Sequence, residues 1–287
     1  MNPTTRLLPD GQRLHLQHGP SDLIIWAEGE RNVAYQAAIN RFETVIAEIV
    51  EELSLLRKML SPLRNRPTGA VAQRMYDACT PFAADAYVTS MAAVAGSVAD
   101  EVLNAMTDHA KISRAYVNNG GDIALHLAPD TSFGTAMLGH NGTDLGRIEI
   151  AAEDGIGGIA TSGRHGRSHS LGVADSVTVL ARSAAMADVS ATLIANEVDL
   201  PGHPAITRRP ACELDDDSDL ADLQVVTACG HLNEQDCTEA LDAGRLRAQA
   251  FQDKGLITSA ALFLQGHAKS TGAHLLVSPK EDQYVEA

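Results

Sequence analysis

The sequence of 287 residues predicts an α+β fold, with mixed or antiparallel sheets packed against helices. Residues 31–60 repeat apolar side chains at steps of three and four, the period of a helix with one buried face. Residues 114–162 instead hold short apolar runs separated by turns that contain Gly, Asn or Pro, a pattern typical of strands. No low-complexity linker interrupts the chain. We therefore expect one domain over 1–287, with two intertwined halves as the alternative.

The composition fits a soluble globular protein, with 45% hydrophobic and 21% charged residues. The formal net charge of −15 argues against nucleic acid and against an anionic membrane as partners, because both need a basic face. No run reaches the ~18–20 apolar residues of a membrane span, and the N-terminal residues lack the apolar core of a signal peptide. The four cysteines form no CxxC pair. We therefore expect a cytoplasmic protein with reduced thiols.

The first third of the chain is predicted to form a hairpin and three helices. In order, these elements are a hairpin at 11–29, a helix at 31–60, a proline-containing loop at 61–69, a short helix at 68–79 and a helix at 90–106. Val71 and Met75 should face inward. The helix at 90–106 has small residues that let another backbone approach closely, namely Ala92, Ala95, Gly96 and Ala99. Such a face fits an intrachain core or a homodimer contact, so both remain open.

The remaining chain alternates predicted strands and helices. The strands are expected at 114–118, 122–127, 133–138, 146–151, 158–162, 176–181, 223–232 and 257–266. Helices are expected at 183–197 and 234–254, the second capped by Asn233 and ended by Gly255. The segment 199–221 is predicted to be an irregular polar loop. Its run Asp215-Asp216-Asp217 lacks the ligand spacing of a calcium loop and is therefore expected to be solvated.

The strongest chemical signal is the basic loop (residues 161–170), which holds two Arg, two His, two Gly and four hydroxyl side chains. Arginine offers a planar fork of donors to phosphate or carboxylate, and glycines let backbone N–H groups approach an anion. We expect four side chains to line an anion pocket: Arg164, His165, Arg167 and His169. The alternative is a basic surface loop that offsets nearby acidic residues.

Asp188 and Thr192 are four residues apart, so they share one face of the predicted helix at 183–197. A carboxylate and a hydroxyl on one face can hold Mg²⁺ and leave positions for water and phosphate oxygens. The same spacing also arises by chance on solvated helix faces.

Residues 118–122, Asn-Asn-Gly-Gly-Asp, lie between two predicted strands. They form either a turn with positive φ at the glycines or a backbone cradle in which Asp122 orients a ligand. Ser162, His169 and Asp175 supply the residue types of an acyl-transfer triad. Ser162 does not lie in a Gly-x-Ser-x-Gly elbow, which argues against that chemistry.

Several motifs in this chain resemble the ApbE family of flavin transferases. They are NNGGDI (118–123), ATSG (160–163), SHS (168–170) and SVTVLARSAAMADVSAT (176–192). Together with SMAAVAGSVADEV and GLITSAALFLQG, they are most similar to a shorter, uncharacterised ApbE-like family of bacteria and archaea, over roughly residues 10–270. The resemblance implies an ApbE-like fold.

ApbE proteins bind FAD and Mg²⁺ and attach FMN to a Thr or Ser of a partner protein. The resemblance implies that Asp188 and Thr192 bind the metal. By position it matches Asp122 to the glycine turn beside the flavin and His169 to the Ser-His element. The expected catalytic residues are Asp122, His169 and Asp175, with Asp122 or Asp175 accepting the proton of the acceptor hydroxyl. The expected cofactor-binding residues are Asn119, Gly120, Gly121, Ser162, Gly163, Arg164, His165 and Arg167. Of these, the resemblance implies Gly120, Gly121, Ser162 and Gly163 by position.

Three features depart from the ApbE pattern. Ala95 stands where the family has Lys, residues 171–175 replace an Asp-Pro-x-Thr-Gly motif, and the family's N-terminal aromatic Asp-Pro flavin motif is missing. The expected function is a Mg²⁺-dependent ApbE-like enzyme acting on a flavin or another anionic small molecule, with FMN transfer as one form. One alternative is a different enzyme on the same scaffold, without flavin, in sulfur assimilation or breakdown of small heterocycles. The other is a non-catalytic binding or assembly protein.

Overall fold

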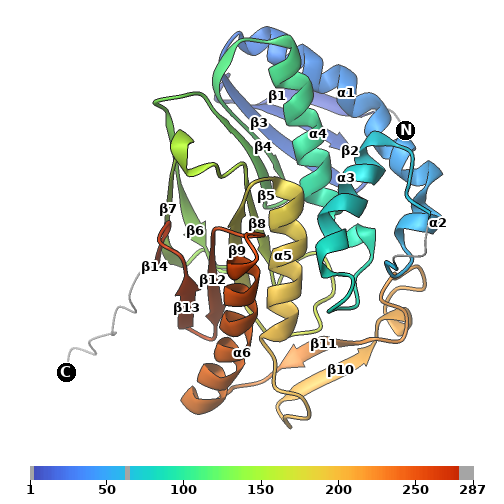
Figure 1. The fold of residues 1–287 in the computed structure, drawn as a ribbon, viewed down its shortest axis with the longest axis vertical. Coiled ribbons are helices and arrows are strands. Elements are labelled where there is room, and N and C mark those ends of the chain that lie inside the picture. The colour runs from blue at the N-terminus through green and yellow to red at the C-terminus, as the bar shows by residue number, and fades with distance from the viewer. Residues whose placement is uncertain (1–2, 62–64, 278–287) are drawn as a thin grey trace.

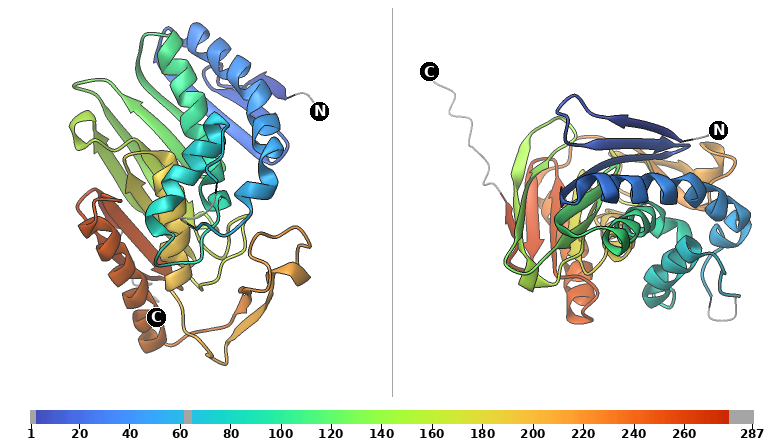
Figure 2. Two further views of the ribbon diagram at one scale, coloured as in Figure 1. Left: turned by 45° about the vertical axis from the view of Figure 1, so that its right-hand side comes forward. Right: turned by 90° about the horizontal axis from the view of Figure 1, so that it is seen from above.

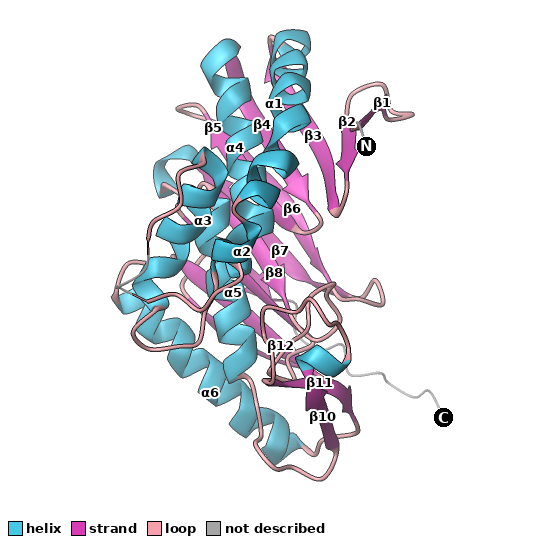
Figure 3. Ribbon diagram, turned by 90° about the vertical axis from the view of Figure 1, so that its right-hand side faces the viewer, coloured by secondary structure: helices cyan, strands magenta, loops and turns pink. Residues whose placement is uncertain are grey.

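The computed structural model describes residues 3–61 and 65–277. Within them, nine strands form one antiparallel sheet, whose order is β1-β2-β3-β4-β5-β8-β9-β12-β13 (Figure 1). Helices cover one face of this sheet, as the side view shows (Figure 3). A smaller sheet of order β14-β7-β6 packs on the other face. The predicted α+β class is therefore confirmed, with antiparallel pairing throughout the described sheets.

The strands of the large sheet alternate their side chains between its two faces. The strands of this sheet are β1 (Thr4–Leu7), β2 (Leu14–His18), β3 (Ser21–Gly29), β4 (Ile112–Asn119), β5 (Asp122–Leu127), β8 (Gly158–Ser162), β9 (Ser176–Ala181), β12 (Ser259–Leu264) and β13 (His267–Thr271). The other strands are β6 (Ser132–Leu138), β7 (Asp144–Ala151), β10 (Ile206–Pro210), β11 (Gln224–Cys229) and β14 (Leu275–Val277). The helices are α1 (Arg31–Glu51), α2 (Leu53–Leu56), α3 (Ala70–Cys79), α4 (Val94–His109), α5 (Ala184–Glu197) and α6 (Glu234–Asp253).

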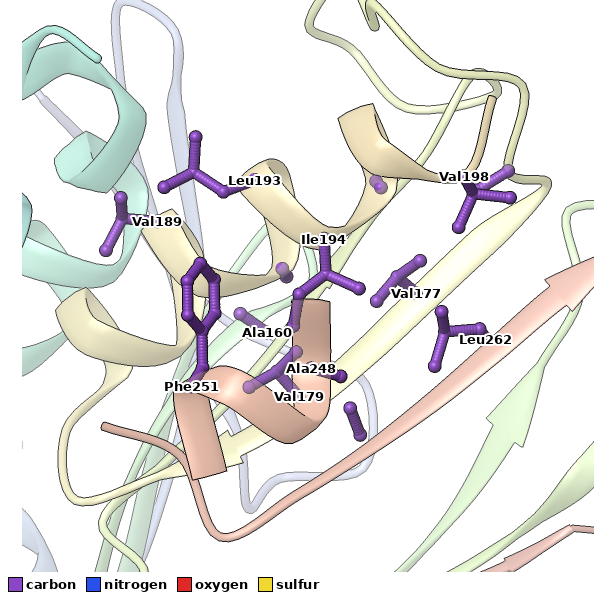
Figure 4. Close-up of a cluster of buried hydrophobic side chains, with 14 of the residues drawn as sticks. Ala160, Val177, Val179, Val189, Leu193, Ile194, Val198, Ala248, Phe251 and Leu262 are labelled. Atoms are coloured by element: carbon purple, nitrogen blue, oxygen red, sulfur yellow. The ribbon is translucent and has the colours of Figure 1, made fainter. Parts of the chain in front are cut away.

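The central strands are buried on both faces. On β12, Leu262 packs toward the helices, whereas Ala261 and Phe263 pack toward the small sheet. Figure 4 shows the helix side, where Ile194 of α5 and Phe251 of α6 meet apolar residues of β9 and β12. Side chains alternate along a strand, so a strand covered on both faces must be apolar throughout. This requirement explains the continuous apolar sequence of β12.

The predicted helix at 31–60 divides into α1 and α2 at Glu52, so that prediction was wrong at this point. Glu52 has φ −110° and ψ 10°, outside the helical range. Its carboxylate accepts hydrogen bonds from the backbone amides of Thr68 (2.9 Å) and Gly69 (2.7 Å), just before α3. The predicted helix at 68–79 is confirmed as α3, with Val71 and Met75 fully buried. Of the loop predicted at 61–69, residues 62–64 lie outside the described residues.

The segment predicted as irregular at 199–221 contains β10, which pairs with β11 and stands apart from the large sheet (Figure 2). The prediction was wrong over these five residues because Ile206–Pro210 shows no apolar alternation. Main-chain hydrogen bonds to a strand later in the chain, rather than burial of one face, form this element. Among the described residues, no helix is both long enough and apolar enough to span a membrane.

The predicted small-residue helix begins as a short 3₁₀ turn, Ser90–Ala93, and continues as α4. Gly96, one of its small residues, lies directly against the start of α5. A Cβ atom added at Gly96 would lie 2.3 Å from the carbonyl oxygen of Ala184, a distance that side chains do not adopt. The small-residue face therefore contacts another helix of the same chain.

We predict that Gly96→Ala destabilises the protein by about 1–3 kcal/mol, because the added methyl overpacks the α4–α5 contact. A loss of stability would indicate overpacking, since replacing Gly with Ala inside a helix otherwise stabilises the protein by about 1 kcal/mol. Urea denaturation measures the change. The control is Gly134→Ala on β6, whose added Cβ would lie 4.0 Å from its nearest neighbour atom. Equal stability of the two variants would contradict the close packing.

Candidate functional site

A cavity of about 370 Å³ lies at the first turn of α4, a size typical of small-molecule sites. Its walls come from residues 87–95, the start of β5, the end of the basic loop, α5 and the acidic loop (residues 214–223). Five of the predicted site residues line it, namely Asp122, Arg167, His169, Asp188 and Thr192. Predicted site residues up to 70 positions apart thus meet at one cavity, as the resemblance implied for a single site.

Asp188 is held by the amino-terminal end of α4. Its Oδ2 atom accepts a hydrogen bond from the backbone N–H of Gly96 at 2.9 Å, and the N–H of Ala95 also donates to its carboxylate. These amides lie in the first turn of the helix, where N–H groups have no intrahelical acceptor and favour negative charge. The Asp188 carboxylate is thereby fixed in orientation, with Thr192 one turn further along the same face of α5.

Asp122 reaches the cavity because of the tight turn between β4 and β5. Gly120 and Gly121 have φ of 68° and 117°, so the predicted positive-φ turn is confirmed. The side chain of Asn118 supports the turn by accepting a hydrogen bond from the Gly121 N–H at 2.9 Å. A Cβ added at Gly120 would lie 2.6 Å from Arg167 Nη2. Glycine therefore allows Arg167 to pack against this turn beside Asp122.

Burial raises the pKa of Asp122 to about 7, although an amide hydrogen bond from Thr161 and the charge of Arg167 oppose the shift. Burial also raises the pKa of Asp188, and the neighbouring Asp122 carboxylate adds to that shift. Carboxylates that share a desolvated site favour the protonated form. A cation in the cavity would favour the ionised carboxylates, because a nearby positive charge lowers the pKa of a carboxyl group.

The whole cavity is rich in carboxylates. Its charged lining residues, apart from His169, are Asp122, Asp188, Asp215, Asp217, Asp219, Arg57 and Arg167. Even with Asp122 and Asp188 protonated, the three aspartates of the acidic loop outnumber the two arginines, so an anionic ligand would need a bound cation to offset repulsion.

The donor set of the cavity fits Mg²⁺. Among the described residues, no group of three or more His, Cys, Asp or Glu side chains is arranged to hold a metal by itself. Mg²⁺ does not require such a cage, since it commonly takes one or two carboxylates together with water and ligand phosphates. Asp188 and Thr192 supply a carboxylate and a hydroxyl from one helix face, which matches that preference.

The structure divides the basic loop between two places. Arg167 and His169 line the cavity, whereas Arg164 and His165 do not. The Arg164 guanidinium bonds to Asp175 at 2.7 Å, and Nε2 of His165 lies 3.3 Å from the same oxygen. The ring of His165 also stacks on His140 with 3.8 Å between centroids. The four predicted anion ligands are therefore not brought together, because Asp175 holds two of them elsewhere.

Six other predicted site residues also lie outside the cavity lining, namely Asn119, Gly120, Gly121, Ser162, Gly163 and Asp175. Asn119 is buried, and its Nδ2 donates to the Ala95 carbonyl at 3.1 Å, so it joins β4 to the start of α4. Ser162 ends β8, paired with Val177. Gly163 has φ 152°, and a Cβ there would lie 2.6 Å from the Asp175 carbonyl oxygen. The candidate triad is not assembled either, since the Asp175 carboxylate bonds to Arg164 and to the Gln265 amide.

Sequence reasoning missed the part of the site formed by the acidic loop and residues 87–89. Thr89 Oγ1 donates a hydrogen bond to the Asp219 carboxylate, and the Tyr87 hydroxyl donates to the Asp219 carbonyl at 2.7 Å. These contacts hold the acidic loop at the cavity. The acidic run was visible in the sequence, but its partners lie about 130 positions away, and no local signal links them.

We predict that Asp122→Asn changes the pH dependence of stability in metal-free protein. Because the folded-state pKa of Asp122 is raised, folded protein retains a proton that the unfolded chain loses between about pH 4 and about pH 7. The stability of the wild type should fall as pH rises through that window. The melting temperature of Asp122→Asn relative to the wild type should therefore rise with pH in EDTA. A constant difference across this range would contradict the prediction.

We predict opposite outcomes for two arginines of the basic loop. Arg167→Ala should weaken binding of pyrophosphate with Mg²⁺ by about tenfold to a hundredfold, because a charge-assisted hydrogen bond contributes ~1.5–3 kcal/mol. Its melting temperature should hardly change, since Arg167 is exposed. Arg164→Ala should lower the melting temperature by breaking the pair with Asp175 and leave the affinity unchanged. Calorimetry and thermal unfolding measure both; exchanged phenotypes would place the anion at Arg164.

Comparison with known proteins finds a matching family and several relatives of this chain. A family model described as "AbpE bacteria" matches residues 5–270. The UPF0280 protein of Methanopyrus kandleri is 35% identical over 158 residues, which cover 54% of this chain and 61% of that protein. The UPF0280 protein of Methanococcus vannielii is 40% identical over 117 residues, covering 39% of this chain and 46% of that protein. Each alignment thus spans less than two thirds of the relative's length.

Among solved structures, the flavin transferase ApbE from Vibrio cholerae matches with a TM-score of 0.51 and 12% identity, over 91% of this chain and 97% of that one. At this identity the likeness establishes the fold, and the ApbE-like α+β prediction is confirmed. The family match runs from β1 to β13 and includes every segment that lines the cavity. The chain therefore belongs to the AbpE bacteria family, whose relatives include the UPF0280 proteins.

Proposed function

We propose that this protein is a Mg²⁺-dependent enzyme of the flavin transferase type, acting on FAD or a similar phosphorylated small molecule in the cytoplasm. The observation that carries the proposal is the shared cavity of Asp122, Asp188, Thr192, Arg167 and His169. The fold shared with a solved flavin transferase supports flavin as the first ligand to test. The acidic lining supports metal dependence, because a pyrophosphate would otherwise be repelled.

Each cavity residue has a role in this proposal. Asp188 and Thr192 would hold the metal, and the α4 amides keep the Asp188 carboxylate in place. Bound Mg²⁺ would supply the positive charge that polarises the pyrophosphate and eases departure of AMP. Arg167 and His169, which line the same cavity, would bind phosphate oxygens.

Asp122 would accept the proton of the acceptor hydroxyl. The acceptor oxygen then forms a new P–O bond to the FMN phosphorus, the P–O bond to AMP breaks, and the proton passes to the Asp122 carboxylate. Asp122 suits this role better than Asp175, because Asp122 lines the cavity and Asp175 is paired with Arg164 outside it.

A second candidate is a different reaction of a phosphorylated molecule on the same scaffold, without flavin. The observation that favours it is Ala95, which lines the cavity at the position where the ApbE pattern has Lys. A methyl group there can neither pair with a phosphate nor carry a proton. Metal binding by Asp188 is common to both candidates.

The experiment is incubation of the protein with FAD, MgCl₂ and an acceptor protein that carries a flavinylation motif, followed by mass spectrometry. We predict an FMN adduct on the acceptor, lost in EDTA and lost with Asp188→Asn, which removes the charged metal ligand. The matched control is Asp108→Asn, which makes the same charge change at an exposed position on α4.

Two other results would change the proposal in different ways. Failure to form an adduct, together with Mg²⁺-dependent binding of pyrophosphate, would favour the second candidate. An Asp188→Asn variant with an unchanged response to Mg²⁺ would remove Asp188 from the metal site and contradict both candidates.

A further inference from the structure

Helices α4 and α5 bind each other's first turns through two carboxylates. Asp188 of α5 accepts a hydrogen bond from the Gly96 N–H of α4 at 2.9 Å. In return, Asp100 of α4 accepts from the N–H groups of Ala184 (3.0 Å) and Ala185 (2.9 Å), the first two residues of α5. Each helix thus provides the carboxylate that satisfies amides at the start of the other, where intrahelical acceptors are lacking.

Asp100 is deeply buried, with 6% of its surface exposed. Burying a carboxylate is costly unless hydrogen bonds satisfy its oxygens, and here one oxygen bonds to each amide. The start of α5 also has an ordinary cap, since Ser183 Oγ accepts from the Met186 N–H at 3.2 Å. Asp100 therefore binds the two amides that the Ser183 cap does not reach.

The start of α5 has little freedom to move. An added Cβ at Gly96 would lie 2.3 Å from the Ala184 carbonyl oxygen, and one at Gly158 of β8 would lie 2.2 Å from the Ala184 nitrogen. The backbone at Ala184 is thus held between α4 and the sheet. With two further bonds from Asp100, both the axial position and the rotation of α5 are determined. Asp188 follows one turn after Ala184, so its direction depends on that placement.

We propose that Asp100 is a positioning residue of the cavity, which directs Asp188 and Thr192 toward a bound metal by fixing the first two amides of α5. This inference rests on the proposed function, because it takes Asp188 and Thr192 as metal ligands. Asp100 does not line the cavity, and its hydrogen bonds to the Ala184 and Ala185 amides connect it to α5. Its charge also raises the pKa of Asp188, so hydrogen exchange at Gly96 is needed to separate positioning from this charge effect.

The test variant is Asp100→Asn, which keeps the size of the side chain but places an NH₂ donor against one of the two amides. We expect its affinity for Mg²⁺, measured by calorimetry with MgCl₂ alone on the full chain, to fall about tenfold or more, as for other residues that orient metal ligands. Asp100→Ser is a second variant that avoids the opposed donor. The control is Asn233→Ala, which removes the side-chain cap of α6 and should lower the melting temperature without changing Mg²⁺ affinity.

A second measurement needs no metal. The Gly96 amide bonds to Asp188 across the helix pair, so its hydrogen exchange reports whether Asp188 is in place. Exchange at Gly96 should accelerate in Asp100→Asn and Asp100→Ser relative to Asn233→Ala. If the Asp100 variants only lower the melting temperature, with Mg²⁺ affinity and Gly96 exchange like those of Asn233→Ala, the positioning role is overturned. If the wild type binds no Mg²⁺, the proposed function fails, while Gly96 exchange still decides whether Asp100 positions Asp188.

Discussion

The close contact between α4 and α5 is the constraint on which the site depends. Gly96 is the residue that permits it, because any side chain there would enter the Ala184 carbonyl group. The contact brings the unpaired amides of each helix within reach of a carboxylate on the other, Asp188 in one direction and Asp100 in the other. A single glycine thus allows both the packing of the helix layer and the orientation of the proposed metal ligand.

The electrostatics of the cavity follow from that packing. Asp188 lies in a desolvated position beside Asp122, and burial raises the pKa of both carboxyl groups. The helix amides offset only part of this cost, and the acidic loop adds further carboxylates at the rim. A site that is unfavourable for two anions is favourable for a cation, which is why metal and phosphate binding should depend on each other here.

Two nearby arginines of the basic loop lie in different environments. Arg164 and Arg167 are three residues apart, yet one pairs with Asp175 near β9 and the other packs over the glycine turn of β4 and β5. Composition alone treats both as anion ligands. The difference arises because Gly163 packs against the backbone of Asp175, which brings Arg164 next to that carboxylate before the chain turns toward the cavity.

The sequence by itself determined most elements, the α+β class and the positive-φ turn at Gly120 and Gly121, because periodicity and turn chemistry are local. It also predicted Asp122, Asp188 and Thr192 as site residues, through helix spacing and a family resemblance, and these three residues line one cavity. Only the tertiary structure decided that the helix at 31–60 is interrupted at Glu52, that residues 206–210 form a strand, and that Arg164 lies outside the cavity while the acidic loop lines it. The reason is physical: each of these depends on a hydrogen bond, ion pair or strand pairing with residues outside the local segment, which local patterns do not encode.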